Sequence, residues 1–388
     1  MSEKNTSTVK QIFKEYYFKH IEQIEPPTRM AEREFGYMTF DHAMIRHLAI
    51  KSSGELRSLI LKEAPNSVYY STSFYNDPSL QMHEKGWKGG ELVFDIDADT
   101  LASPCRQEHD KWVCRDCGYQ ELGVKPEKCP KCKGRRLHEI NIACGVCLDA
   151  AKKEALHLMD ILTEDFGLSR SEIEVFFSGS MGYHISVTSS IFEAADQVAR
   201  SEIVDYVSGQ SLLIESLGIA KKLSHEELTQ KLPSASDKGW RGRVARHFQH
   251  KFEAEAGGSQ DVRGKMAELY LSMRYAKFQL AVQDAVKESG STVDPSVTTD
   301  IHRIFRMPNT LHGKTGLLKK QCGSLEGFDP LVEAVALGRE PLNIKVDQAP
   351  KFTLGGEWFG PFKSETVELP RMAAVYLLGL GMAKLEVG

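Results

Sequence analysis

Apolar and polar positions alternate with regular periods along the chain, and these periods predict its first helices and strands. Near the N-terminus, apolar residues recur every three or four positions and stop before Pro26 and Pro27, which predicts an amphipathic helix. Residues 68–74 and 91–97 are rich in β-branched and aromatic side chains and are predicted to be strands. A second helix is expected to begin at Asp149, as its N-cap, and to stop at Gly167.

The rest of the pattern predicts a mixed α/β (α+β) fold in five segments. Residues 173–178 and 183–187 predict two strands joined by a turn that contains glycines. Helical periodicity from 199 to 278 predicts a helical subdomain. The expected segments are 1–102 (first part of the core), 103–148 (a cysteine-rich insert), 149–198 (second part of the core), 199–278 (the helical subdomain) and 279–388 (third part of the core and a C-terminal segment).

Composition and charge limit the class of protein. The chain is 41% hydrophobic and 26% charged, which is typical of a globular protein and excludes a disordered or collagen-like one. With 49 Lys and Arg against 53 Asp and Glu, the net charge is -4, so any contact with nucleic acid must come from local patches. The N-terminus has no secretory signal, and the longest charge-free apolar stretch, 372–383, is too short to span a bilayer. A cytoplasmic protein without a membrane partner is expected.

The cysteines predict metal sites. Seven of the eight cysteines lie between Cys105 and Cys147, in a long chain without an export signal, so metal ligation is favoured over disulfides. Three CxxC pairs follow Cys105 and His109, and four ligand pairs make two closed tetrahedral zinc sites of structural type. The spacing allows three ways of combining the pairs, and His138 could replace His109. We favour a nested arrangement, in which the inner, ribbon-like site has Cys114, Cys117, Cys129 and Cys132 and the outer site has Cys105, His109, Cys144 and Cys147.

Two carboxylates are predicted to share one face of a strand. Asp95 and Asp97 lie two positions apart, so both point to one side of the strand while its apolar residues point to the other. Two carboxylates on a rigid face suit Mg²⁺ or a similar hard cation, and a pair of such ions can activate a hydroxyl and stabilise a leaving pyrophosphate. Taken alone, the pattern also fits a solvated acidic strand end.

A glycine-spaced turn follows further along. The segment 178–184 reads SGSMGYH, and its glycines allow backbone N–H groups to approach an anion. Ser178 and His184 could add donors to phosphate oxygens. The segment lacks the Gly-Lys-Ser/Thr of a phosphate-binding P-loop, and an ordinary hairpin with a surface histidine is the alternative.

Positive charge is concentrated around Pro308, in the segment 301–320. Arg303 and Arg306 are three residues apart and are expected to share one helical face, as a clamp on a triphosphate requires. Asp294, upstream of this segment, is the candidate for a third carboxylate. A second basic cluster, which includes Arg241, Arg243 and Arg246, could contact a template backbone or could be a solvated helix face.

Three of these motifs, in this order, resemble the small catalytic subunit of archaeal and eukaryotic DNA primase, and most closely its archaeal branch. They are ELVFDID at 91–97, SGSMGYH at 178–184 and RMPNTLHGKTG at 306–316, and REFGY at 33–37 is also similar to that family. The resemblance implies a primase-type α/β catalytic core with a zinc-binding module and a helical insertion. It also implies that the segment from Cys114 to Cys132 is an addition to a single zinc site.

The resemblance further assigns roles to residues. Carboxylates that would hold two catalytic Mg²⁺ or Mn²⁺ ions are Asp95, Asp97 and Asp294. Side chains that would bind the nucleotide's triphosphate are Ser178, His184, Arg306 and His312, and those expected near its sugar or phosphates are Arg33 and Tyr37. The family's glycine turn commonly carries an arginine where this chain has Ser180 or Met181. Arg303 could supply that contact instead.

The function implied by the resemblance is synthesis of short RNA primers on single-stranded DNA from nucleoside triphosphates, beside a large primase subunit and in the nucleoid, or in the nucleus if the source is eukaryotic. One alternative is a primase-like polymerase for repair or plasmid replication that favours deoxynucleotides. Another is a non-catalytic zinc-ribbon protein that binds nucleic acid. That second alternative leaves the carboxylates, the glycine turn and the basic segment jointly unexplained.

Overall fold

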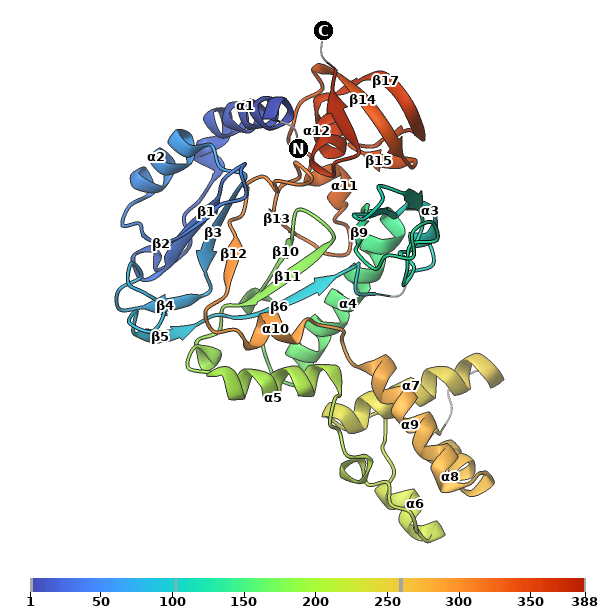
Figure 1. Cartoon of the computed structure of the whole chain (residues 1–388). Helices are drawn as coiled ribbons and strands as arrows, with labels where there is room; N and C mark the ends of the chain where they lie inside the picture. The colour runs from blue at the N-terminus through green and yellow to red at the C-terminus, as the bar shows by residue number, and fades with distance from the viewer. Residues whose placement is uncertain (1–2, 102, 258–260, 387–388) are drawn as a thin grey trace. The chain divides into compact units, whose positions relative to one another are not determined.

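The chain forms two compact units in a computed structural model that describes residues 3–101, 103–257 and 261–386 (Figure 1). The first unit comprises Met1–Lys152, Glu174–Ala195 and Asp300–Gly388, and the second comprises Lys153–Ile173 and Asp196–Thr299. The predicted helical segment 199–278 lies inside the second unit, which extends beyond this segment at both ends. The mixed α/β (α+β) class is confirmed. Among the described residues, no helix combines the length and apolar character that a membrane span requires.

The predicted elements of the N-terminal part are present, except that one predicted strand is divided into two. Helix α1 (Glu3–His20) buries Val9, Phe13 and Tyr17 completely along one face, as the period of its apolar residues predicts. The predicted strand 68–74 is two strands, β3 (Ser67–Ser71) and β4 (Ser73–Tyr75), because the chain leaves one sheet at Thr72 and enters another. Strand β6 (Leu92–Asp97) lies where it was expected.

The expected start of the second helix was wrong. Helix α4 (Gly145–Glu164) begins before Asp149, which lies inside it instead of at its N-cap. The Leu148 N–H already donates to the Cys144 carbonyl at 3.0 Å, so the helix begins within the last CxxC pair. It ends at Glu164, and Gly167 follows with a left-handed φ of 72°.

Two four-stranded sheets form the centre of the first unit (Figure 1). The catalytic sheet, as we name it for its predicted residues, has the order β13 (Lys320–Gln321), β10 (Ile173–Phe177), β11 (Gly182–Val187) and β6. The second sheet has the order β12 (Ile304–Arg306), β3, β1 (Glu34–Met38) and β2 (Met44–Ala49). In the catalytic sheet, β11 and β6 are antiparallel with Asp95 opposite His184 and Asp97 opposite Gly182.

The remaining parts of the first unit are smaller. The cysteine-rich insert contains α3 (Arg106–His109) and a sheet of β7 (Lys111–Cys114), β8 (Gln120–Leu122) and β9 (Leu137–Ile140). The C-terminal part has a sheet of β14 (Pro341–Ala349), β17 (Phe362–Pro370) and β18 (Ala383–Leu385), with α12 (Arg371–Gly379) packed on it. The other elements are α2 (Ser53–Glu63), β5 (Trp87–Gly90), α11 (Pro330–Glu333), β15 (Phe352–Leu354) and β16 (Glu357–Phe359).

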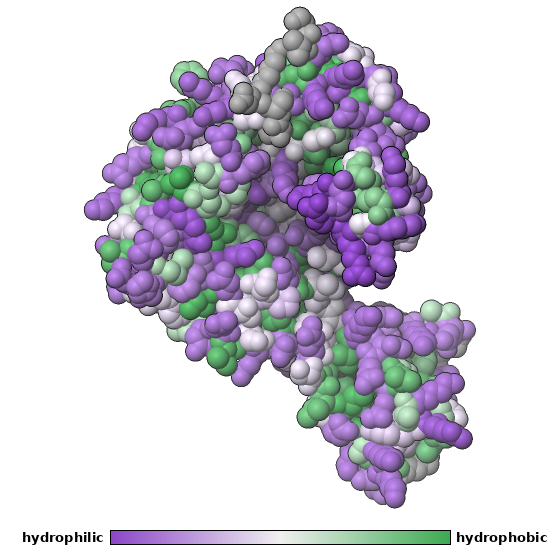
Figure 2. Space-filling model, in the orientation of Figure 1, coloured by the Kyte–Doolittle hydropathy of each residue, from purple (hydrophilic) through white to green (hydrophobic). Residues whose placement is uncertain are grey.

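The apolar residues of the C-terminal helix are buried, and the visible surface of the protein is mostly hydrophilic. Met372 to Leu378, the start of the apolar stretch 372–383, are all buried in α12, so this segment serves the protein's own core. On the face shown in Figure 2, hydrophilic side chains cover most of the surface. The same view shows a hollow in the face of the first unit, lined largely by hydrophilic residues.

The second unit is helical. Its helices are α5 (Gln197–Ser208), α6 (His225–Lys231), α7 (Gly239–Ala256), α8 (Val262–Ser272), α9 (Tyr275–Ser289) and α10 (Pro295–Thr299). Helices α6 to α9 pack around buried aromatic residues such as Phe248 and Phe278, and α10 packs against α5. The arginines of its basic cluster are engaged in ion pairs. Arg243 is buried and pairs with Asp165 at 2.7 Å, and Arg246 pairs with Glu164 at 2.9 Å. These pairs neutralise much of the charge that a template backbone would require.

Candidate active site and metal centres

The two carboxylates of β6 lie on the face of the catalytic sheet that also carries His184. Asp95 is 9% exposed, and its Oδ1 lies 3.5 Å from Nε2 of His184, its direct partner on β11. On the other face of the strand, Phe94 and Ile96 are buried in the core. Polar and apolar side chains therefore alternate along β6 as the sequence predicts, and packing of the apolar side chains holds the strand that carries the carboxylates in place.

The glycine turn between β10 and β11 is closed by its own backbone. The Ser178 N–H donates to the Gly182 carbonyl at 2.8 Å, and the N–H groups of Ser180 and Gly182 both lie 3.3 Å from Ser178 Oγ. Gly179 has a left-handed φ of 86°, and a Cβ at this position would lie 3.1 Å from the Cβ of His312. Glycine is thus required both by the backbone conformation and by the close approach of the basic segment.

The basic segment is extended where a helix was predicted. Arg306 ends strand β12, so Arg303 and Arg306 do not share a helical face, and that prediction was wrong. Pairing of β12 with β3 explains the difference, because it places Arg306 opposite Tyr69 and satisfies the backbone in the sheet. Arg306 Nη1 donates to the Ser178 carbonyl at 2.5 Å.

Contacts between the basic segment and the glycine turn make one cluster from two distant parts of the sequence. Thr315 Oγ1 donates to the Gly179 carbonyl at 2.6 Å, in addition to the contact that Arg306 makes with Ser178. His312 is held in its own turn, where the Lys314 N–H donates to its Nδ1 at 3.2 Å. The structure therefore brings Ser178, His312 and Arg306 together beside the sheet that carries Asp95.

The histidines of this cluster are shifted toward their neutral forms. Burial lowers the pKa of His184 well below its ordinary value, and the positive charges of Lys319 and Arg306 lower it further. Burial also lowers the pKa of His312 well below its ordinary value, with a further contribution from Arg306. A neutral imidazole retains one N–H donor and one acceptor, so each ring can orient a ligand without adding another full charge.

Arg33 directly precedes β1 and Tyr37 lies on it, and their contacts differ. The Arg33 side chain is completely buried, and it donates to the carbonyls of Thr28 and Ser71 at 2.7 and 2.8 Å and pairs with Glu91. Its hydrogen-bonding capacity is thus used within the protein. Tyr37 is half-buried, and burial raises the pKa of its hydroxyl, with a smaller contribution from Glu63.

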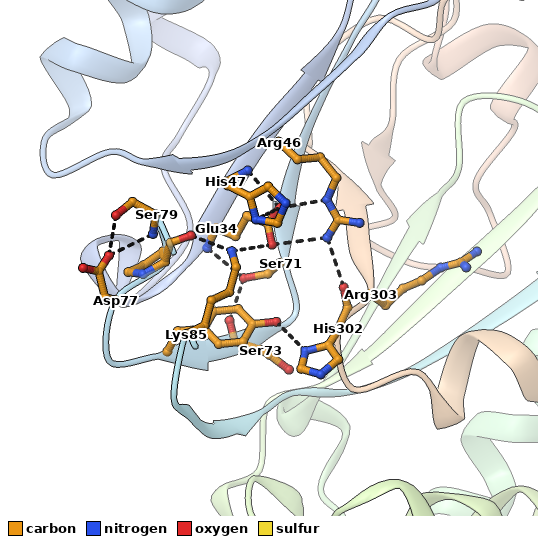
Figure 3. Close-up of polar contacts among 12 residues, drawn as sticks. Glu34, Arg46, His47, Ser71, Ser73, Asp77, Ser79, Lys85, His302 and Arg303 are labelled. Carbon is orange, nitrogen blue, oxygen red and sulfur yellow. Dashed lines mark hydrogen bonds and ion pairs between the residues drawn. The ribbon is translucent and has the colours of Figure 1, made fainter. Parts of the chain in front are cut away.

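A buried charged network around Glu34 was not predicted from the sequence (Figure 3). Glu34 and Lys85 are both fully buried and pair at 2.8 Å, and Arg46 Nε approaches Glu34 at 2.8 Å. Arg46 also donates to the His302 carbonyl at 3.4 Å, and the Tyr75 hydroxyl lies 3.1 Å from His302 Nδ1. The network thereby holds the segment that precedes β12, and Figure 3 shows the Arg303 side chain pointing away from it.

Asp294, the third predicted carboxylate, belongs to the second unit. It is exposed, and its Oδ1 accepts the N–H of Ser296 at 2.8 Å at the start of α10. Its role as a ligand of a catalytic ion stays a prediction.

The outer cysteine cluster consists of Cys105, His109, Cys144 and Cys147, whose ligand atoms all lie within 4.8 Å of one another. The Sγ atoms of Cys105 and Cys147 are 3.3 Å apart, and His109 Nε2 lies 3.4 Å from Cys147 Sγ. The other nitrogen of this ring, Nδ1, lies 3.0 Å from the buried carboxylate of Asp110, an arrangement that fixes the ring orientation of metal-binding histidines.

The inner cluster consists of Cys114, Cys117, Cys129 and Cys132, again within 4.8 Å. The distance from Cys114 Sγ to Cys132 Sγ is 3.6 Å, and that from Cys117 Sγ to Cys129 Sγ is 3.8 Å. Thiolates bound at about 2.3 Å in a tetrahedral zinc site lie about 3.8 Å apart. The four-ligand geometry fits zinc, and the grouping of the ligands is the nested one. His138 is exposed on β9 and belongs to neither cluster.

Several residues at the site escaped the sequence analysis. Glu34 and Lys85 are 51 positions apart, and Lys319 lies in a Lys-Lys pair that is typical of a solvated surface. Only the alternation of Lys319 with Gln321 along a short strand could have indicated that Lys319 points to the same side as the predicted site.

This chain is similar in sequence to known proteins over nearly its whole length. Residues 127–322 match the family model described as DNA primase small subunit. The chain is 36% identical to the DNA primase small subunit PriS of Nitrosopumilus maritimus, over 97% of this chain and 98% of that protein. It is also 36% identical to the PriS protein of Cenarchaeum symbiosum, over 99% of both chains. Among solved structures, it is similar to the polymerase domain from Mycobacterium tuberculosis Ligase D in complex with DNA, with a TM-score of 0.32 and 11% identity over 82% of this chain and 81% of that one. At this identity and coverage to the PriS proteins, the chain belongs to the DNA primase small subunit family.

Proposed function

We propose that this chain is the catalytic subunit of a DNA primase and that it joins nucleoside triphosphates into short RNA primers on single-stranded DNA. Membership of the small-subunit family supports a primase. The observation that carries the finer proposal is the meeting of a carboxylate pair, a glycine turn and a basic segment on one side of the catalytic sheet. In particular, Arg306 donates to the backbone of the turn whose neighbouring strand carries His184 beside Asp95.

Asp95 and Asp97 fit a catalytic Mg²⁺ or Mn²⁺ site because they offer hard oxygen donors from one rigid strand face. Asp294 is the proposed third ligand, by its place ahead of the basic segment in the family motif. When bound, a pair of such ions would promote attack of a primer 3′-hydroxyl on the α-phosphate and stabilise the pyrophosphate that leaves.

The chain's own residues are proposed to position the nucleotide. Arg306, together with Arg303, would bind the triphosphate as fixed cations, and the glycines of the turn would allow its oxygens to approach the backbone closely. Ser178, His184 and His312 would add neutral donors. Arg33 would support the site from within through its contacts with Glu91 and Ser71, and Tyr37 would lie near the sugar. Positioning and electrostatic stabilisation would then supply most of the rate acceleration.

The two cysteine clusters are proposed to hold one structural Zn²⁺ each. Both offer four protein ligands and leave no open coordination position, so neither suits a catalytic ion. The proposed partners are a large primase subunit, implied by the family's designation as the small subunit, and a single-stranded DNA template. The proposed location is the cytoplasm, at the nucleoid.

The test is synthesis on unprimed single-stranded DNA with labelled nucleoside triphosphates and Mg²⁺ or Mn²⁺, in parallel with Asp95→Ala. Short products that require Asp95 would support the proposal. Replacing ribonucleotides by deoxynucleotides distinguishes a primase from a polymerase for repair or plasmid replication. If the chain binds single-stranded DNA but forms no product, even after a large subunit is added, a non-catalytic protein would be favoured instead.

A further inference from the structure

Lys319 lies on the face of the catalytic sheet that carries the predicted site. Strands β13 and β10 pair so that Lys320 is opposite Phe177 and Gln321 is opposite Phe176. Lys319 precedes this pair, next to Ser178, and alternation along the strand places its side chain on the side of Phe176. That side also bears His184, whose partner across the sheet is Asp95.

The side chain is enclosed by aromatic rings. Lys319 is 2% exposed, and its Nζ lies 4.7 Å from the ring centre of Phe176, 5.3 Å from that of Phe305 and 6.0 Å from that of Tyr70. Phe305 is also in contact with His184, at 4.5 Å between ring centres. Within the described parts of the chain, no carboxylate forms an ion pair with this ammonium group.

A buried ammonium group without an ion pair is costly, and aromatic faces compensate only part of that cost. Burial, with a smaller contribution from Arg306, lowers the pKa of Lys319 to about 7, although the carboxylates of Glu91, Asp95 and Glu174 act in the opposite direction. Lys319 and His184 both contact the ring of Phe305. The Lys319 ammonium group thus lies close to His184 and has no permanent anionic partner within the described residues.

A ligand with several negative charges would supply the missing partner. We propose that Lys319 is a further nucleotide-binding residue, whose ammonium group contacts the polyphosphate of the incoming nucleotide. The glycine turn of this chain has Ser180 and Met181 and no cation, so Lys319, opposite this turn, would supply the charge from the neighbouring strand. The inference rests on the proposed function, because it assumes that the triphosphate binds at this cluster.

The test compares Lys319→Met with Lys320→Met in the full chain. Methionine keeps the length and apolar stem of lysine and removes the charge, and Lys320 is the adjacent lysine on the opposite face of the same strand. We expect Lys319→Met to lower kcat/KM for nucleoside triphosphate roughly 10- to 100-fold, the range expected for one hydrogen bond to a charged group. Lys320→Met is expected to retain the wild-type value.

Two further readouts separate binding from a structural role. Equilibrium binding should weaken more for ATP than for AMP in Lys319→Met, since only ATP carries the distal phosphates. The thermal unfolding temperature without nucleotide should stay unchanged or rise, because the substitution removes an unpaired buried charge. Three results would overturn the proposal. They are equal weakening of ATP and AMP binding, an unfolding temperature low enough to explain the loss of activity by unfolding, and a kcat/KM equal to that of Lys320→Met.

The design keeps this inference apart from the proposed function. If the wild-type chain forms product that depends on Asp95 while Lys319→Met behaves as Lys320→Met does, the proposed function stands and the role of Lys319 is rejected. If the wild-type chain forms no product but binds ATP more weakly after Lys319→Met, the polyphosphate contact stands and the primase activity is rejected.

Discussion

Two lysine–glutamate ion pairs of equal length offer a controlled test of what burial does to a charge in this fold. Lys85 pairs with Glu34 at 2.8 Å, and both side chains are 0% exposed. Lys88, three residues later, pairs with Glu32 at the same distance, but these side chains are 39% and 33% exposed. We expect Lys85→Met and Lys88→Met to differ strongly in their effect on stability.

The expected magnitudes follow from the surroundings. Removing one partner of a buried pair costs about 3–5 kcal/mol because it leaves an uncompensated charge. Glu34 would retain Arg46 at 2.8 Å and the His47 N–H at 3.1 Å, so we expect the lower end of this range, about 3 kcal/mol. An exposed pair contributes only about 0–1 kcal/mol, which sets the expectation for Lys88→Met.

Thermal unfolding followed by circular dichroism and calorimetry is the assay. At roughly 2–4 °C per kcal/mol for domains of comparable size, Lys85→Met should lower the unfolding temperature by about 6–12 °C, and Lys88→Met by less than about 4 °C. The double substitution Lys85→Met with Glu34→Gln should recover part of the loss, because the remaining carboxylate charge is removed. Equal small shifts for the two single variants would refute the argument that burial determines the cost.

The remaining predictions concern the site and the metal clusters. Asp95→Ala should abolish primer synthesis while circular dichroism remains that of the wild type, and near-normal synthesis would rule out its role as a metal ligand. Gly179→Ala should reduce activity by at least tenfold, since a side chain at its left-handed φ of 86° also meets His312; unchanged steady-state kinetics would contradict a tight turn. Cys114→Ser should reduce the zinc content from two ions to one per chain in native mass spectrometry, and fewer than two ions in the wild type would contradict the two-site proposal.

The faces of single strands and helices could be predicted from the sequence, because backbone geometry sets the spacing at which side chains return to the same face. Side chains alternate across a strand, so the shared face of Asp95 and Asp97 follows from their spacing alone. The same holds for the buried face of α1. The CxxC spacing likewise predicted which cysteines could share a metal, although it left three combinations open, and only the folded insert groups them as a nested pair of clusters.

Contacts between distant segments were decided by tertiary structure. Arg306 lies in a strand, against the helical prediction, because β3 supplies hydrogen-bonding partners that the local sequence does not contain. The enclosure of Lys319 depends on rings from β3, β10 and β12, and the pairing of Glu34 with Lys85 spans 51 positions. Burial and charge pairing depend on which surfaces meet when the sheets pack. Sequence periodicity therefore predicted the strands and candidate ligands of this protein, and packing alone determined which charges became buried and which side chains met.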